Sequence, residues 1–140
     1  MGTEIIYKEL SYRIVGLAME VYNELGYGFL EKVYERSLMI ELAKIGLHGV
    51  SQKKIDVYYD AQVVGDYFAD IIVNNCVILE IKAGEGLRDE HKAQLINYLK
   101  ATDKEVGLLL NFGKSPQFKR VIFTNDRKKK WNTDDADRTD

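Results

Sequence analysis

Two segments near the N-terminus carry apolar residues at the three- and four-residue spacing of a buried helix face. The first spans residues 4–25 and is followed by Gly26, which can end a helix. The second spans about residues 29–45 and is followed by Gly46. Its apolar positions are Leu30, Tyr34, Leu38, Leu42 and Ile45. The pattern predicts two helices joined by a short loop that contains glycine.

After these helices the pattern changes to the two-residue alternation of β-strands. Apolar and polar residues alternate over residues 54–59, and further strand-like segments cover residues 63–73 and 76–82. Short turns separate the segments, the second at residues 74–75. We therefore expect a three-stranded antiparallel meander. The third strand begins with four almost wholly apolar residues, which predicts a central strand covered on both faces.

The helical spacing returns over residues 88–101, and an apolar strand over residues 106–110 follows it. A helix between two buried strands indicates a crossover that makes the strands parallel. A last strand is predicted at residues 121–123, near an edge of the sheet. The order is helix, helix, three strands, helix, two strands. It predicts an α/β fold with a single mixed β-sheet flanked by helices.

The composition supports one globular domain, with 140 residues, 46% hydrophobic, 30% charged and a single proline. Residues 132–140 contain four Asp and one Arg; without them 19 basic and 18 acidic residues remain, a net charge of +1. We expect a domain over residues 1–131 and a disordered acidic tail over residues 132–140. The basic run at residues 127–130 could contact phosphates, although a solvated charged edge is the commoner explanation.

Membrane insertion and sulfur-based chemistry are not expected. No apolar run approaches the roughly 18 residues of a membrane span, and Glu4, Lys8 and Glu9 interrupt any signal peptide. We therefore expect a cytoplasmic protein. Cys76 is the single cysteine and there are two histidines, so a disulfide or a thiolate zinc cluster is excluded. Any bound metal should have mainly oxygen ligands.

Charged residues end the most hydrophobic strand, where the pattern requires apolar ones. Glu80 and Lys82 project from the same face, about 7 Å apart, and the preceding turn brings Asp70 beside Glu80. Two carboxylates that leave coordination positions open suit Mg²⁺ or Mn²⁺. A neighbouring lysine can orient or activate a water for attack on phosphorus, as phosphodiester hydrolysis requires. The alternative is a salt bridge of Lys82 with Asp70 or Glu80.

Other polar residues stand where they can extend this group. Gln94 and Tyr98 are four residues apart on the predicted third helix, so they share a face. Glu31 stands at the start of the second helix, where a carboxylate also favours the helix dipole. Taken alone, each of these residues has an ordinary structural explanation.

Five ordered segments carry a set of motifs: GFLEKVYE at 28–35, YFADIIV at 67–73, LEIKA at 79–83, HKAQLINYLK at 91–100 and GLLLNFG at 107–113. Together they resemble the GxxExxY proteins, small bacterial and archaeal members of the PD-(D/E)XK nuclease superfamily. The resemblance covers about residues 4–124. A lone Glu-x-Lys would be weak evidence, whereas five segments in order with matching spacing are strong.

The resemblance implies a restriction-endonuclease-like core that binds a divalent metal, Mg²⁺ or Mn²⁺. Asp70 and Glu80 would be metal ligands, with the Ile81 carbonyl as a further ligand. Lys82 would position the nucleophilic water, and Glu31 would add a carboxylate from the helix. These roles are what the resemblance implies.

The resemblance also implies that Gln94 and Tyr98 correspond to the Gln-x-x-x-Tyr motif of exonuclease-like domains. Ala69 replaces the proline that precedes the aspartate in the superfamily motif, and this change removes no ligand. We expect a metal-dependent nuclease, a hydrolase acting on DNA. The alternative is a module of the same fold that binds nucleic acid or a partner protein with little turnover. A homodimer is compatible with both.

Overall fold

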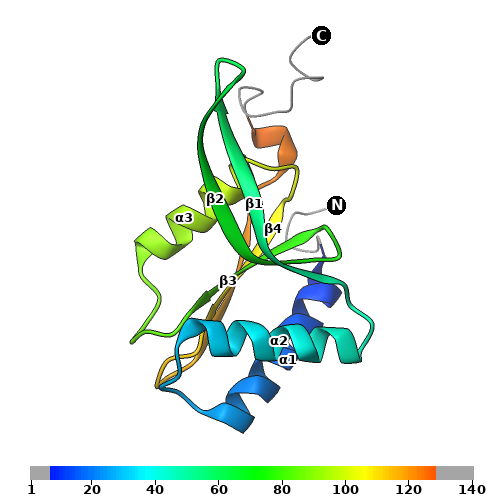
Figure 1. Cartoon of the computed structure of the whole chain (residues 1–140), viewed down its shortest axis with the longest axis vertical. Coiled ribbons are helices and arrows are strands. Elements are labelled where there is room, and N and C mark those ends of the chain that lie inside the picture. The colour runs from blue at the N-terminus through cyan, green and yellow to red at the C-terminus, as the bar shows by residue number, and fades with distance from the viewer. Residues whose placement is uncertain (1–6, 129–140) are drawn as a thin grey trace.

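A computed structural model describes residues 7–128 of the chain. Five strands form one mixed sheet, with helices on both of its faces (Figure 1). The elements are α1 (Lys8–Leu25), α2 (Glu31–Lys44), β1 (Gly49–Tyr59), β2 (Gln62–Val73), β3 (Val77–Lys82), α3 (Asp89–Lys100), β4 (Val106–Asn111), β5 (Gln117–Ile122) and a short 3-10 helix, η2 (Asn125–Arg127). The predicted order of helices and strands is confirmed.

The sheet follows chain order, β1-β2-β3-β4-β5, so β3 is its central strand. β1, β2 and β3 pair antiparallel as the predicted meander. β3 and β4 pair parallel because α3 carries the chain back across the sheet between them. β5 closes the sheet as an antiparallel edge strand. The mixed sheet and its crossover are therefore confirmed.

Two hydrophobic clusters hold the layers together, one on each face of the sheet. α1 and α2 pack on one face and α3 on the other (Figure 1). Val77, Leu79 and Ile81 of β3 join the α1–α2 cluster, whereas Ile78 joins the α3 cluster. All four side chains are fully buried. The prediction that this strand is covered on both faces is confirmed. Packing on both faces holds the end of β3 rigidly in place.

The start of α2 differs from the prediction. The helix begins at Glu31 rather than near residue 29, because Leu30 has the extended backbone of a cap residue. Leu30 consequently leaves the buried face and is 81% exposed. Ile45, past the other end of the helix, is also exposed. Apolar periodicity alone therefore overestimated the length of this helix by a residue or two at each end.

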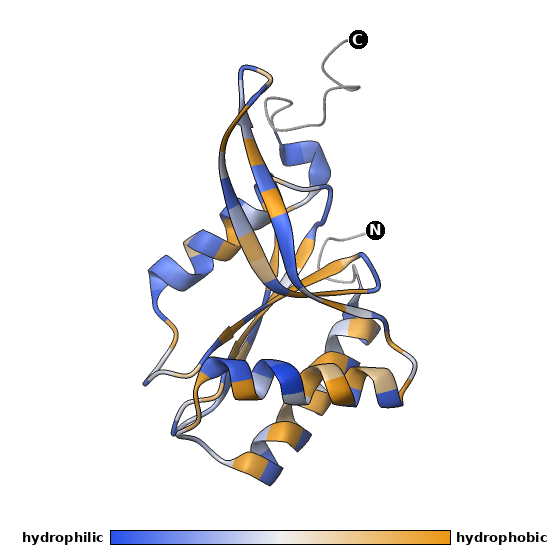
Figure 2. Cartoon of the chain, in the orientation of Figure 1, coloured by the Kyte–Doolittle hydropathy of each residue, from blue (hydrophilic) through white to orange (hydrophobic). Residues whose placement is uncertain are grey.

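The sheet divides at β2. β1 and β2 pair along nearly their whole length, but β2 pairs with β3 only through residues 71–73 within the described chain. The two strands then continue beyond the sheet as a ribbon that ends in a tight turn at Asp60 and Ala61 (Figure 1). Hydrophobic and hydrophilic positions alternate along the β1 strand of this ribbon (Figure 2). The divergence of β2 from β3, called the strand fork below, opens the sheet next to the end of β3.

The loops that follow β3 and β4 contact each other closely behind the fork. The Asn111 side chain accepts a hydrogen bond from the Gly84 N–H (3.0 Å) and donates one to the Gly84 carbonyl (3.1 Å). A Cβ on Gly113 would collide with that carbonyl. Gly113 is buried, so the backbones approach this closely only because position 113 has no side chain.

Gly113→Ala is therefore expected to destabilise the fold by roughly 1–3 kcal/mol, the usual cost of overpacking. Denaturant unfolding measures the effect. Gly16→Ala on α1 is the matched control, because a Cβ there meets nothing within 4 Å. Alanine at that helix position should gain up to about 1 kcal/mol. Equal stability of Gly113→Ala and the parent would contradict the close approach of the loops.

Three predictions concern the ends of the chain, and a fourth concerns membranes. The first residues of the predicted N-terminal helix, the boundary at residue 131 and the acidic tail over residues 132–140 all lie outside the described residues. Between residues 7 and 128, no helix combines the length and the apolar character that crossing a bilayer requires.

Candidate active site

Asp70 and Glu80 meet at the strand fork. Main-chain pairing of β2 with β3 ends at Ile71 and Leu79, one residue before this point. Side-chain bonds continue it: the Asp70 N–H donates to Oε2 of Glu80 (3.1 Å), and the Ile81 N–H donates to Oδ2 of Asp70 (2.7 Å). The fold therefore brings together the two carboxylates that the sequence placed on adjacent strands.

The two carboxylates lie in a setting that disfavours two negative charges. Burial raises the pKa of Asp70, and burial together with the charge of Asp70 raises the pKa of Glu80 to about 8. Lys82 lowers the pKa of both groups. Without a further positive charge, Glu80 is thus mostly protonated at neutral pH. A bound cation would relieve this by allowing both groups to ionise.

Lys82 ends β3 next to the pair. Alternation along the strand puts Glu80 and Lys82 on the face of Ile78, which packs in the α3 cluster. The Lys82 carbonyl accepts a hydrogen bond from the Phe112 N–H (2.8 Å), which fixes its backbone. Its ammonium forms no ion pair with either carboxylate in the part of the chain that the structure describes. The salt-bridge alternative is therefore not what the structure contains.

α3 contributes Tyr98 to this region but not Gln94. Tyr98 is buried, and its pKa is raised to about 12 by burial and by the charges of Glu80 and Asp70. Its phenol therefore lies near the carboxylates and remains a proton donor at neutral pH. Gln94, one turn earlier, is exposed, and no hydrogen bond joins it to either carboxylate among residues 7–128.

Glu31 and Tyr34 share a helix turn but differ in their surroundings. Glu31, the first residue of α2, is exposed and close enough to raise the pKa of Glu80 slightly. Tyr34 is buried; its hydroxyl donates to the Gly26 carbonyl (2.8 Å) and its ring stacks on Phe112 at 4.5 Å. The tyrosine thus fixes the loop before α2 and, with it, the position of Glu31.

Glu35 on α2 is a second buried carboxylate, 5% exposed, that was not among the predicted site residues. It accepts hydrogen bonds from Ser51 Oγ (2.6 Å) and Gln52 Nε2 (3.0 Å) of β1. Its position three residues before Leu38 places it on the apolar face of the helix. A charged residue in an apolar position was the signal that identified Glu80, and it would have identified Glu35 as well.

The donor set fits a hard divalent cation. Among the described residues, no three His, Cys, Asp or Glu side chains form a metal-binding group by themselves. Mg²⁺ commonly takes one or two carboxylates and completes its coordination with waters and substrate phosphates, so Asp70 and Glu80 meet its requirement. The Ile81 carbonyl faces the same side of β3 as its N–H, which contacts Asp70.

The pKa of Glu80 predicts how the stability of the metal-free protein depends on pH. Because the folded value of about 8 exceeds the ordinary 4.5, the folded state holds this proton more tightly. The resulting stability is fully present below pH 4.5 and is lost as the pH rises through 8. We expect the melting temperature in EDTA to fall over this window and the fall to be smaller in Glu80→Gln. Parallel curves for the two proteins would contradict the assignment.

Comparison with known proteins supports the fold. A family model described as the PD-(D/E)XK nuclease superfamily matches residues 8–121, which include the whole strand fork. The solved structure titled "Crystal structure of SSO0001" is similar, with a TM-score of 0.51 and 20% identity over 86% of this chain. This chain spans 59% of the length of that protein. A search of curated proteins found no match.

Proposed function

We propose that this chain, which belongs to the PD-(D/E)XK nuclease superfamily, is a Mg²⁺- or Mn²⁺-dependent nuclease that hydrolyses phosphodiester bonds in DNA. The convergence of Asp70 and Glu80 at the strand fork, with Lys82 beside them, is the observation that carries the proposal. The segment from Gly28 to Tyr34 supports placement in the GxxExxY group.

Asp70, Glu80 and the Ile81 carbonyl would hold the cation, and Glu31 would add a carboxylate from α2. When bound, the cation would supply positive charge that polarises the scissile phosphate and the attacking water. Glu80 would give up its proton on binding, because its raised pKa reflects the lack of such a charge. Metal affinity should therefore increase with pH.

Lys82 would act on the reacting groups directly. Because its ammonium forms no ion pair with a carboxylate of residues 7–128, it can donate a hydrogen bond to the attacking water or to a phosphate oxygen. Tyr98 stays protonated and can donate to a phosphate nearby. Gln94 is exposed on the same helix and can contact the DNA backbone next to the scissile phosphate. These interactions would orient the phosphodiester for attack.

A second candidate is a module of the same fold that binds nucleic acid or a partner protein without cleaving. The observation that favours it is that no three acidic, His or Cys side chains of residues 7–128 form a metal-binding group. Under this alternative, Asp70 and Glu80 would be remnants of a site that lacks enough ligands.

Cleavage of a substrate panel separates the two candidates. The panel contains linear, circular, single-stranded and branched DNA with matching RNA, each incubated with Mg²⁺, Mn²⁺ or EDTA. We expect cleavage of at least one DNA substrate with metal and none in EDTA. Binding without cleavage throughout the panel would contradict the nuclease proposal and support the binding module.

A further inference from the structure

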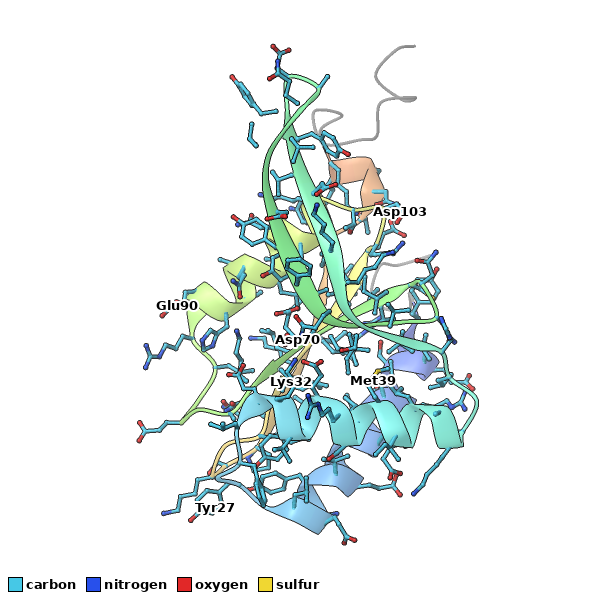
Figure 3. The ribbon with its side chains drawn as sticks, viewed as in Figure 1. Tyr27, Lys32, Met39, Asp70, Glu90 and Asp103 are labelled. Carbon is cyan, nitrogen blue, oxygen red and sulfur yellow. The ribbon has the colours of Figure 1, made fainter. Side chains whose placement is uncertain are left out.

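The Asp70 carboxylate is held at both oxygens by donors from the strands on either side. The Ile81 N–H of β3 donates to Oδ2 (2.7 Å), and Gln52 Nε2 of β1 donates to Oδ1 (3.3 Å). Donors on both oxygens restrict rotation of a carboxylate and so fix the direction in which its free electron pairs point. Figure 3 shows Asp70 near the point where the strands of the fork cross, between them and α2 in this view.

Gln52 reaches Asp70 from an unusual backbone conformation. Its φ of 53° lies in the left-handed region, and the β1–β2 ladder lacks the Gln52–Asp70 pair between Ser51–Ile71 and Lys53–Ala69. This conformation is strained for a residue that has a side chain. The irregularity therefore occurs at the residue opposite the candidate metal ligand, where a functional role can maintain it.

The Gln52 side chain also binds Glu35, on the helix that packs against β1. The same Nε2 that donates to Asp70 also donates to Glu35 Oε1 (3.0 Å). The other oxygen of Glu35 accepts from Ser51 Oγ (2.6 Å) and lies 3.6 Å from Lys32 Nζ. Glu35 is buried, so α2 provides a fixed anchor for Gln52. A chain of contacts thus runs from α2 through β1 to the fork.

We infer that Gln52, anchored by Glu35, is a positioning residue that orients the Asp70 carboxylate for a divalent cation. The inference rests on the proposed function. Gln52 acts through Asp70 and is assigned no contact with substrate. Loss of an outer partner of a metal ligand typically costs 10–100-fold in affinity, and we expect that range here.

The test is calorimetric titration of the full chain with Mn²⁺, comparing the parent with Gln52→Gly. Glycine suits the left-handed backbone, which offsets the lost hydrogen bond to Glu35, so the variant should still fold without metal, yet bind Mn²⁺ at least about tenfold more weakly. Ala61→Gly is the matched control: its φ of 62° lies in the hairpin turn, remote from the fork. It should gain the same relief of strain and keep the parent affinity.

A second readout separates positioning from general stability. With Gln52→Gly, the Mg²⁺ concentration for half-maximal cleavage should rise about tenfold, while the rate at saturating Mg²⁺ stays within a fewfold of the parent. Gln52→Met, which lacks the donor, replaces the glycine variant if that one does not fold. Parent-like Mn²⁺ affinity in a folded Gln52 variant would overturn this inference but leave the proposed function standing. A parent that binds no Mn²⁺ would overturn the proposed function and this inference with it.

Discussion

Lys82→Met is expected to cleave DNA about a hundredfold to a thousandfold more slowly than the parent while it still binds metal and DNA. If Lys82 acts on the attacking water or on the phosphate, its contribution is made mainly in the transition state. Methionine keeps most of the stem volume. Since Lys82 forms no ion pair among the described residues, the substitution breaks no salt bridge there.

The measurement is single-turnover cleavage at saturating Mg²⁺, together with the melting temperature and the DNA affinity of each protein. Lys44→Met, at the far end of α2 from Glu31, is the matched control. This substitution also removes one positive charge, but from an exposed position away from the fork, so the variant should keep the parent rate of cleavage. A Lys82→Met protein that cuts within a fewfold of the parent would contradict the mechanism.

Asp70→Asn and Glu80→Gln are expected to lose Mn²⁺ binding and keep the fold. Removing a direct ligand should cost more than the roughly 10–100-fold typical of outer partners. Isosteric amides are needed because Glu80 is 4% exposed, so alanine would leave a cavity. The amide oxygen can still accept the main-chain N–H bonds of the fork.

Calorimetric titration with Mn²⁺ measures this loss, and the melting temperature without metal reports the fold. The latter should be unchanged or higher, because each substitution replaces a carboxyl group that burial and its neighbour make costly to ionise. Asp66→Asn is the control: Asp66 lies on the same ribbon, half-exposed and paired with Lys54, and should keep parent affinity. Unchanged affinity in both fork variants would refute the metal assignment.

The spacing of apolar residues predicted the fold well because the apolar positions of most elements are the ones that the sheet and helices bury. The apolar run that became β3 is buried on both faces, and the turn at residues 74–75 sets the β2–β3 register. Helix ends were less accurate: Leu30 continued the apolar spacing, yet its cap conformation exposes it. The backbone at a helix end depends on the neighbouring loop, which periodicity does not describe.

The site was predicted only as far as local geometry reaches. Asp70 and Glu80 are joined by one tight turn, so their proximity followed from the strand register. Glu35 and Gln52 lie on different elements and meet through the packing of α2 on β1. The left-handed backbone at Gln52 has no glycine or asparagine to indicate it. Tertiary contacts of this kind are not encoded in a local pattern.

The proposal that this chain is a metal-dependent nuclease is tested most directly by the rate of single-turnover cleavage. The parent and Glu80→Gln are purified and assayed in parallel. The substrate is the panel member that the parent binds most tightly, with Mg²⁺ or EDTA added. We predict cleavage by the parent in Mg²⁺, none in EDTA, and a loss of at least about a hundredfold in Glu80→Gln. Equal rates for the two proteins, or tight binding by the parent without any cleavage, would contradict the account.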